Sequence, residues 1–166
     1  DGHWGFHGAE TPLDMEPDII TVRMGKQNIH QQMLDWPEYF STPEAVPKTA
    51  CTFNVGMFLL ADEIIDNVPQ GSKEFSVLTT YGVEPVIDAI PSSAIKKHKN
   101  ARAWLTKKSA RALLEFLNGI KDNPAYTLEK STLNRLRAIW EKSPHLEEKI
   151  ANIKMIEDVL MELKMI

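Results

Sequence analysis

The basic residues between positions 96 and 111 have the types and spacing that suggest chemistry most directly. They are Lys96, Lys97, Lys99, Arg102, Lys107, Lys108 and Arg111. No acidic residue lies between Asp88 and Glu115, and Trp104 lies within the same run. Proteins that bind single-stranded nucleic acid combine cations that follow the phosphates with aromatic rings on which the bases stack. These cations and Trp104 are therefore the predicted nucleic-acid-binding residues, and nucleic acid or another acidic surface is the predicted partner.

The distribution of charge over the chain leaves a second interpretation open. Residues 1–91 hold 14 acidic and 4 basic side chains, a net charge of −10, whereas residues 92–166 hold 9 acidic and 15 basic side chains, a net charge of +6. Opposite charges attract, within one chain or between copies, and a charged helix face is also often simply solvated. The alternative to nucleic-acid binding is therefore a protein-interaction module that binds a peptide, other subunits or a second copy of itself.

Two histidines near the start of the chain, His3 and His7, are followed by acidic residues: Glu10, Asp14, Glu16 and Asp18. Side chains of these types can bind a divalent cation. Histidines four apart share a face only in a helix, and glycines at positions 2, 5 and 8 disfavour a helix there. We therefore expect no metal site but a flexible or partner-bound arm over residues 1–18, with Trp4 and Phe6 as anchors. A metal-dependent enzyme is the third interpretation.

Motifs of the common enzyme classes are absent from the sequence. It contains no glycine-rich phosphate loop, no Gly-x-Ser-x-Gly and no Cys-x-x-Cys. A non-catalytic role without catalytic residues or a cofactor is therefore favoured over an enzyme. The only cysteine, Cys51, excludes an internal disulfide and suits a reducing intracellular compartment. The longest apolar run, residues 55–61, is too short to span a membrane, so no membrane partner is expected.

The first half of the chain is expected to mix strands and helices. Alternation and β-branched residues predict a strand over 18–24, and apolar residues on one face predict a helix over 27–36 that a proline ends. Residues 54–68 repeat apolar side chains at helical spacing, which predicts a core helix. A second strand is expected over 74–81 and a short helix over 83–90.

The second half of the chain is predicted to be helical throughout. Helices are expected over 93–105, 107–118 and 127–142, and Pro144 opens a last one. On the first of these helices, Trp104 falls on the same face as Lys97 and Asn100. Helices joined by short loops should pack as a bundle.

Two short segments resemble known families. Residues 113–124 (LLEFLNGIKDNP), together with residues 136–139 and Ser143-Pro144, resemble the helical PUB module, which binds peptide tails of an AAA ATPase. Residues 53–59 (FNVGMFL) are similar to a segment of sugar-phosphate nucleotidyltransferases. The two resemblances exclude each other, so the sequence is assigned to no family.

The predicted fold class is mainly α with a minor α+β part. It comprises the arm over residues 1–18, an acidic mixed region with one or two short strands over 19–91, and a basic bundle of about four helices over 92–166. The predicted function is non-catalytic binding of nucleic acid or an acidic surface, through the basic face at 96–111, within a larger assembly.

Overall fold

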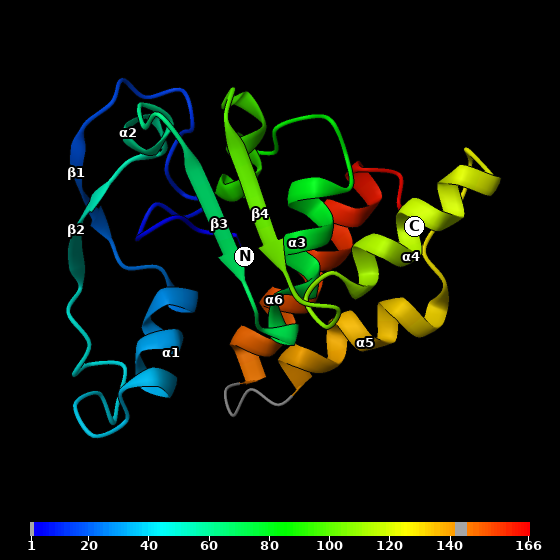
Figure 1. The fold of residues 1–166 in the computed structure, drawn as a ribbon. Helices are drawn as coiled ribbons and strands as arrows, with labels where there is room; N and C mark the ends of the chain where they lie inside the picture. The colour runs from blue at the N-terminus through cyan, green and yellow to red at the C-terminus, as the bar shows by residue number, and fades with distance from the viewer. Residues whose placement is uncertain (1, 142–145) are drawn as a thin grey trace.

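In a computed structural model, the described part of the chain forms two small sheets, with helices packed beside one of them (Figure 1). The structure describes residues 2–141 and 146–166, without the side chains of residues 140–149. The first sheet pairs β1 (Ile19–Arg23) with β2 (Thr49–Phe53) in antiparallel register. The second pairs β3 (Ile64–Val68) with β4 (Ala101–Leu105) in parallel register.

The first strand and the first helix agree with the predictions from sequence. β1 confirms the strand expected over 18–24, in a segment rich in the β-branched residues that pleated sheets favour. The helix α1 (Lys26–Asp35) confirms the one expected over 27–36. It ends at Asp35 and is followed by Trp36, which is not helical because the residue before a proline is disfavoured in the helical conformation.

The prediction of one core helix over residues 54–68 is wrong. Only α2 (Val55–Leu59) is helical, and its first turn is capped by the Asn54 side chain, which accepts a hydrogen bond of 3.0 Å from the Met57 N–H. The chain then turns and enters β3 instead of continuing as a helix. The β-branched residues of β3 suit a strand, and β4 supplies a pairing partner that local spacing cannot reveal.

The prediction of a helix over residues 93–105 is also wrong. Residues 91–97 form the 3-10 helix η2 (Pro91–Lys97), and β4 follows. Ser93 does not cap an α-helix: its buried hydroxyl accepts from the Ile87 N–H at 2.7 Å and donates to the Ile87 carbonyl at 3.1 Å. The basic helical face expected to join Lys97, Asn100 and Trp104 therefore does not form.

The strand predicted over residues 74–81 is a helix, α3 (Glu74–Tyr81), which follows the 3-10 helix η1 (Gly71–Lys73). Phe75 and Leu78 are both buried, one helical turn apart. The hydroxyl of Thr79 donates to the Phe75 carbonyl at 2.9 Å, which accommodates a β-branched residue inside the helix. The short helix expected over 83–90 is replaced by turns closed by a bridge between Ile87 and Ile90.

The remaining helices are α4 (Arg111–Asp122), α5 (Lys130–Glu141) and α6 (Leu146–Glu162), and they confirm three predicted helices with shifted ends. Thr106 and Ser109 hold the turn before α4, where their hydroxyls donate to the carbonyls of Pro69 and Val68. Gly119 lies inside α4 and leaves room for the Tyr126 ring, because a Cβ there would lie 2.4 Å from it. The expected start of the last helix at Pro144 lies outside the described residues.

The main hydrophobic core lies between α3, α4, α5 and α6. Its fully buried side chains include Leu78, Leu136, Ile156 and Leu160, while Ile150 on α6 is 59% exposed. The predicted fold class, mainly α with a four-helix C-terminal bundle, is wrong, because the structure is mixed α/β. The segment expected as the first bundle helix contributes β4, and α3 comes from the region expected to lie outside the bundle.

β3 and β4 lie on opposite sides of Pro91 in the sequence, so the parallel sheet joins the acidic and basic regions. The helices in the described part of the chain include none with both the length and the apolar composition that crossing a membrane requires.

Candidate functional site

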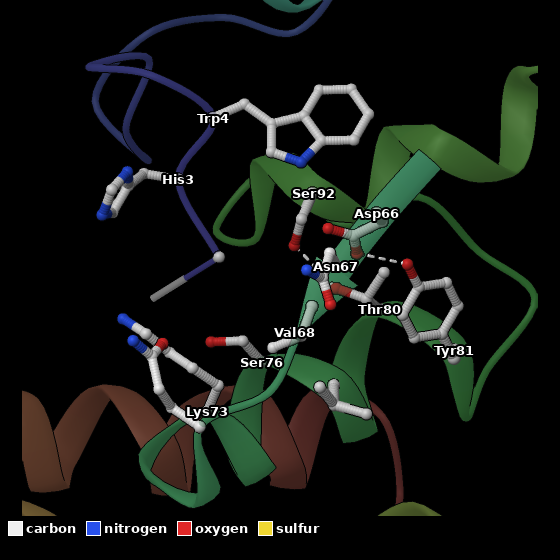
Figure 2. A pocket seen from close by; sticks show the side chains of 13 residues that line it. His3, Trp4, Asp66, Asn67, Val68, Lys73, Ser76, Thr80, Tyr81 and Ser92 are labelled. Atoms are coloured by element: carbon white, nitrogen blue, oxygen red, sulfur yellow. Dashed lines mark hydrogen bonds between the residues drawn. The ribbon is translucent and has the colours of Figure 1, made fainter. Parts of the chain in front are cut away.

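A cavity of about 200 Å³ lies at the end of β3, between the N-terminal loop and the start of α3 (Figure 2). Its wall includes His3 and Trp4 from the loop, Asp66 from β3, and Lys73, Ser76 and Tyr81 from the η1 and α3 segment. Side chains that are far apart in sequence therefore converge on one hollow. We call this cavity the His3–Lys73 pocket.

Glycines place the N-terminal loop against the pocket. Gly2 and Gly5 have positive φ angles of 66° and 56°, which favour glycine. A Cβ on Gly2 would lie 2.5 Å from the Ser92 hydroxyl oxygen, and one on Gly5 would lie 2.5 Å from the Thr52 hydroxyl oxygen. The backbone N–H of Ser92 donates to the Gly2 carbonyl at 2.7 Å. Side chains larger than hydrogen would push the loop away from the pocket.

The described residues of the N-terminal arm, 2–18, lie against their own chain. Trp4 and His7 exchange backbone hydrogen bonds of 2.9 and 3.2 Å, and the Trp4 ring packs edge-to-face on Phe58 with centroids 5.5 Å apart. Leu13 is buried in a small cluster with Val55. In the described residues, the turns of the arm therefore bury apolar side chains against other segments of the same chain.

His3 has the features of a proton acceptor. Its Nδ1 lies 2.8 Å from the Gly5 carbonyl oxygen, so the proton of the neutral ring is on Nδ1 and the lone pair is on Nε2. Burial lowers the pKa of His3 below its ordinary value, the Gly5 carbonyl opposes this shift, and the positive charge of Lys73 lowers the pKa further. His3 is therefore neutral at pH 7.

Lys73 provides the positive charge of the pocket. It ends η1, and Ser76 follows one turn later on the same side, so an ammonium group and a hydroxyl group reach the cavity together. An ammonium group is a compact point charge with donors for several oxygen atoms. This pair suits an anionic group such as a phosphate.

Acceptors and hydroxyl groups form the opposite wall. The Tyr81 hydroxyl donates to the Asp66 carboxylate at 2.5 Å, and the Thr80 and Ser92 hydroxyl oxygens lie 2.6 Å apart (Figure 2). Burial raises the pKa of Tyr81 well above its ordinary value, and the Asp66 carboxylate raises it further. Tyr81 therefore remains a donor at neutral pH and holds Asp66 in place beside the cavity.

The predicted nucleic-acid-binding residues lie on other parts of the surface, and none of them lines the His3–Lys73 pocket. Lys96 donates to the Val83 and Pro85 carbonyls, Arg102 forms an ion pair with Glu63, and Arg111 forms one with Glu115 at 3.2 Å. The other members are exposed: Lys97, Lys99, Trp104, Lys107 and Lys108. They are spread over the end of η2, β4 and the turn before α4 instead of one helix face.

The histidines considered as metal ligands have separate surroundings. His3 lies at the pocket, whereas both ring nitrogens of His7 contact backbone groups, the Val55 N–H and the Thr11 carbonyl. Within residues 2–141 and 146–166, no three histidine, cysteine or acidic side chains are grouped so that they could hold a metal ion.

Sequence reasoning missed Asp66, Lys73 and Tyr81. Asp66 fell in the helix predicted over 54–68, Tyr81 fell in the strand predicted over 74–81, and Lys73 lay between these two predicted elements. One signal was available. Gly71-Ser72-Lys73 follows an apolar, β-branched segment and precedes residues that turn out to be helical. A small-residue turn with a lysine between a strand and a helix is a common place for anion binding.

Comparison with known proteins gives one distant similarity. The chain is 25% identical over 109 residues to a glucosamine-6-phosphate deaminase from Shouchella clausii (strain KSM-K16). The aligned part covers 66% of this chain and 41% of that protein, so the chain spans less than half the length of the relative. No family model matches the chain.

Proposed function

We propose that the His3–Lys73 pocket binds a phosphorylated amino sugar. The observation that carries this proposal is the convergence of a cationic side chain, Lys73, and a neutral histidine, His3, on one small cavity. The cavity of about 200 Å³ is smaller than the roughly 300 Å³ at which sites for drug-sized ligands begin, which suits a small ligand. The similarity to a protein named glucosamine-6-phosphate deaminase supports the choice of sugar.

Each wall of the pocket has a role in this proposal. Lys73 and Ser76 hold the phosphate, because an ammonium group and a hydroxyl group both donate to phosphate oxygens. Asp66 accepts hydrogen bonds from the amino or hydroxyl groups of the sugar, and the Tyr81 hydroxyl keeps the Asp66 carboxylate oriented. His3 lies beside the sugar as a neutral proton acceptor. Because the chain spans 41% of the relative, binding is the activity we propose for it.

Calorimetric titration with glucosamine 6-phosphate at pH 7.5 tests this proposal. We expect Lys73→Gln to weaken binding roughly 10- to 100-fold, the range for a lost hydrogen bond to a charged group. Lys99→Gln is the matched control, because Lys99 is an exposed lysine that does not line the pocket, and its affinity should equal that of the wild type.

Glucosamine without the phosphate is the ligand control. It should bind the wild type and Lys73→Gln equally weakly, because Lys73 then has no anion to hold. Equal affinities for both sugars, or equal losses in Lys73→Gln and Lys99→Gln, would show that the pocket does not hold a phosphate.

Binding of nucleic acid or an acidic surface is a second proposal, and the exposure of Trp104 favours it. The ring is 64% exposed on β4, and four exposed lysines lie on the neighbouring segments: Lys97, Lys99, Lys107 and Lys108. A gel-shift series with single-stranded DNA and RNA at rising salt tests it, since neutralised phosphates release counterions. Binding should weaken steeply with salt, and absence of binding at low salt would exclude this function.

We also propose that the protein works in a reducing intracellular compartment and associates with other subunits or with copies of itself. The free, exposed thiol of Cys51 supports the first part, because oxidising compartments favour paired cysteines. The opposite net charges of residues 1–91 and 92–166 support the second. Sedimentation at low and high salt tests association, which should decrease as salt screens these charges.

A further inference from the structure

His7 is completely buried, with 0% exposure, between the N-terminal loop and the start of α2. Its Nδ1 accepts a hydrogen bond of 3.0 Å from the Val55 N–H. Its Nε2 lies 3.1 Å from the Thr11 carbonyl oxygen. A backbone N–H can donate only to an unprotonated nitrogen, and a carbonyl only accepts. The two contacts therefore require a neutral ring with its proton on Nε2.

The His7 ring connects α2 to the loop that carries His3 and Trp4, here called the pocket loop. The backbone N–H groups of His7 and Trp4 each donate a hydrogen bond to the carbonyl of the other residue, and Trp4 lines the pocket next to His3. On the other side, the Val55 N–H is the first of α2, which follows the capping residue Asn54. The side-chain amide of Asn54 also donates to the Glu16 carbonyl at 2.6 Å. The α2 side of the His7 contact is thus held in place by Asn54, and the loop side carries the pocket residues His3 and Trp4.

The surroundings of His7 disfavour its charged form. Val55, which donates to the His7 ring, belongs to an apolar cluster with Leu13 and Ala94, and α2 contains no charged residue. Burial lowers the pKa of His7 below its ordinary value, and the Thr11 carbonyl opposes this only in part.

The charged groups on the neighbouring elements are directed elsewhere. The Glu10 carboxylate lies beside Gly8 and Gly25, where a Cβ on either glycine would be 2.6 Å from one of its oxygens. Lys96, on η2, donates to the Val83 and Pro85 carbonyls. The other acidic residues of the N-terminal segment are exposed: Asp14, Glu16 and Asp18. His3 lies on the pocket side of the loop.

We infer that His7 is a positioning residue that holds the pocket loop closed while its ring is neutral and releases the loop when the ring is protonated. A proton on Nδ1 replaces an acceptor by a donor that faces the Val55 N–H, so the contact with α2 is lost. The loop with His3 and Trp4 then moves away from the Lys73 side of the pocket. The effect on the ligand rests on the proposed sugar-phosphate function, whereas the opening of the loop does not.

The direction of the pH dependence follows from the lowered pKa. The unfolded or opened form has a histidine pKa near 6.5, whereas the closed form binds a proton less readily. The opened form therefore holds more protons as the pH falls below about 6.5. Closure is complete above that pH and weakens as the pH decreases toward the pKa of the buried ring.

Amide hydrogen exchange of Val55 in the ligand-free protein tests the positioning role directly. We expect protection of this amide, corrected for intrinsic exchange, to fall roughly tenfold or more from pH 7.5 to pH 5, since one pKa unit corresponds to a factor of ten. His7→Gln retains an acceptor and a donor without a titrating group, so its protection should be independent of pH. His3→Gln is the matched control and should keep the wild-type pH dependence.

A parallel titration with glucosamine 6-phosphate shows whether the loop controls binding. Wild-type affinity should fall between pH 7 and pH 5. His3→Gln should retain the part of this fall that is due to His7, and His7→Gln should lack that part. His7→Phe, which fills the space without hydrogen bonds, should bind weakly at all pH values. Val55 protection that does not change with pH in the wild type, or that changes equally in His7→Gln, would overturn the inference. A pH-dependent Val55 amide without sugar binding at any pH would support the positioning role and reject the proposed function.

Discussion

The backbone N–H of Ser92 donates a hydrogen bond of 2.7 Å to the carbonyl oxygen of Gly2. The Ser92 hydroxyl oxygen also lies 2.6 Å from the hydroxyl oxygen of Thr80 on α3. A single residue of η2 therefore joins the N-terminal loop to the helix that forms the floor of the His3–Lys73 pocket (Figure 2). Changes that move Gly2 away from Ser92 should alter the pocket.

Gly2→Ala should destabilise the protein and weaken ligand binding together. The residue has a φ of 66°, and its new Cβ would lie 2.7 Å from the Ile90 methyl carbon. Strain of this kind costs about 1–3 kcal/mol, which urea denaturation can measure. Gly71→Ala is the control, because its Cβ would make an ordinary contact of 3.4 Å and should change the free energy of unfolding by less than about 0.5 kcal/mol. Equal effects of both variants would contradict this role of Gly2.

Arg135→Met should lower the free energy of unfolding by about 2–4 kcal/mol. The Arg135 guanidinium donates to Glu74 at 3.0 Å and to Glu115 at 2.5 Å, so it connects α5 with α3 and α4. The Glu74 side chain is only 8% exposed, and removal of its partner leaves a buried charge unpaired.

The matched control for Arg135 is Arg137→Met. Arg137 pairs with Glu157 at 2.6 Å, where both side chains are about a third exposed, and such pairs contribute about 0–1 kcal/mol. Chemical denaturation should therefore show a clearly lower free energy of unfolding for Arg135→Met than for Arg137→Met. A loss for Arg135→Met as small as that for Arg137→Met would show that Glu74 does not depend on this arginine.

Tyr81 should remain protonated through pH 11. Its pKa is raised by burial and then by the Asp66 carboxylate, so the folded state retains a proton that the unfolded chain releases near pH 10. The resulting stabilisation is complete below pH 10 and is lost as the pH rises through the raised pKa. The Cζ resonance of labelled tyrosine, assigned with Tyr81→Phe, measures this. Titration of that resonance near pH 10 would mean that the contact with Asp66 is absent in solution.

Trp104→Ala should leave the fold almost unchanged. With 64% of the side chain exposed, its removal should cost less than about 1 kcal/mol, whereas Leu136→Ala, at a completely buried position, should cost about 2–5 kcal/mol. In the same gel-shift assay, loss of the ring should weaken nucleic-acid binding by the roughly 1–3 kcal/mol of one stacked base. An intact fold with unchanged affinity would remove Trp104 from the second proposed function.

Local sequence determined the elements whose signals lie within one segment. β1, α1 and the last three helices follow from β-branched alternation, proline stops and helical spacing in residues 18–36 and 107–162. These signals lie within a few residues of each other, so they can be seen without knowledge of the fold.

The tertiary structure alone decided β3, β4 and the pocket. Residues 54–68 and 93–105 have apolar spacing that a helix could use, but parallel pairing of Ile64 with Ala101 and of Val68 with Leu105 brings both segments into a sheet. A partner so distant in sequence leaves no local signal. His3, Asp66 and Lys73 meet for the same reason: glycines at positions 2 and 5 turn the chain start toward β3, and η1 carries the lysine to the opposite wall. Residue types showed that a histidine and a lysine were available, and only packing between distant segments placed them in one cavity.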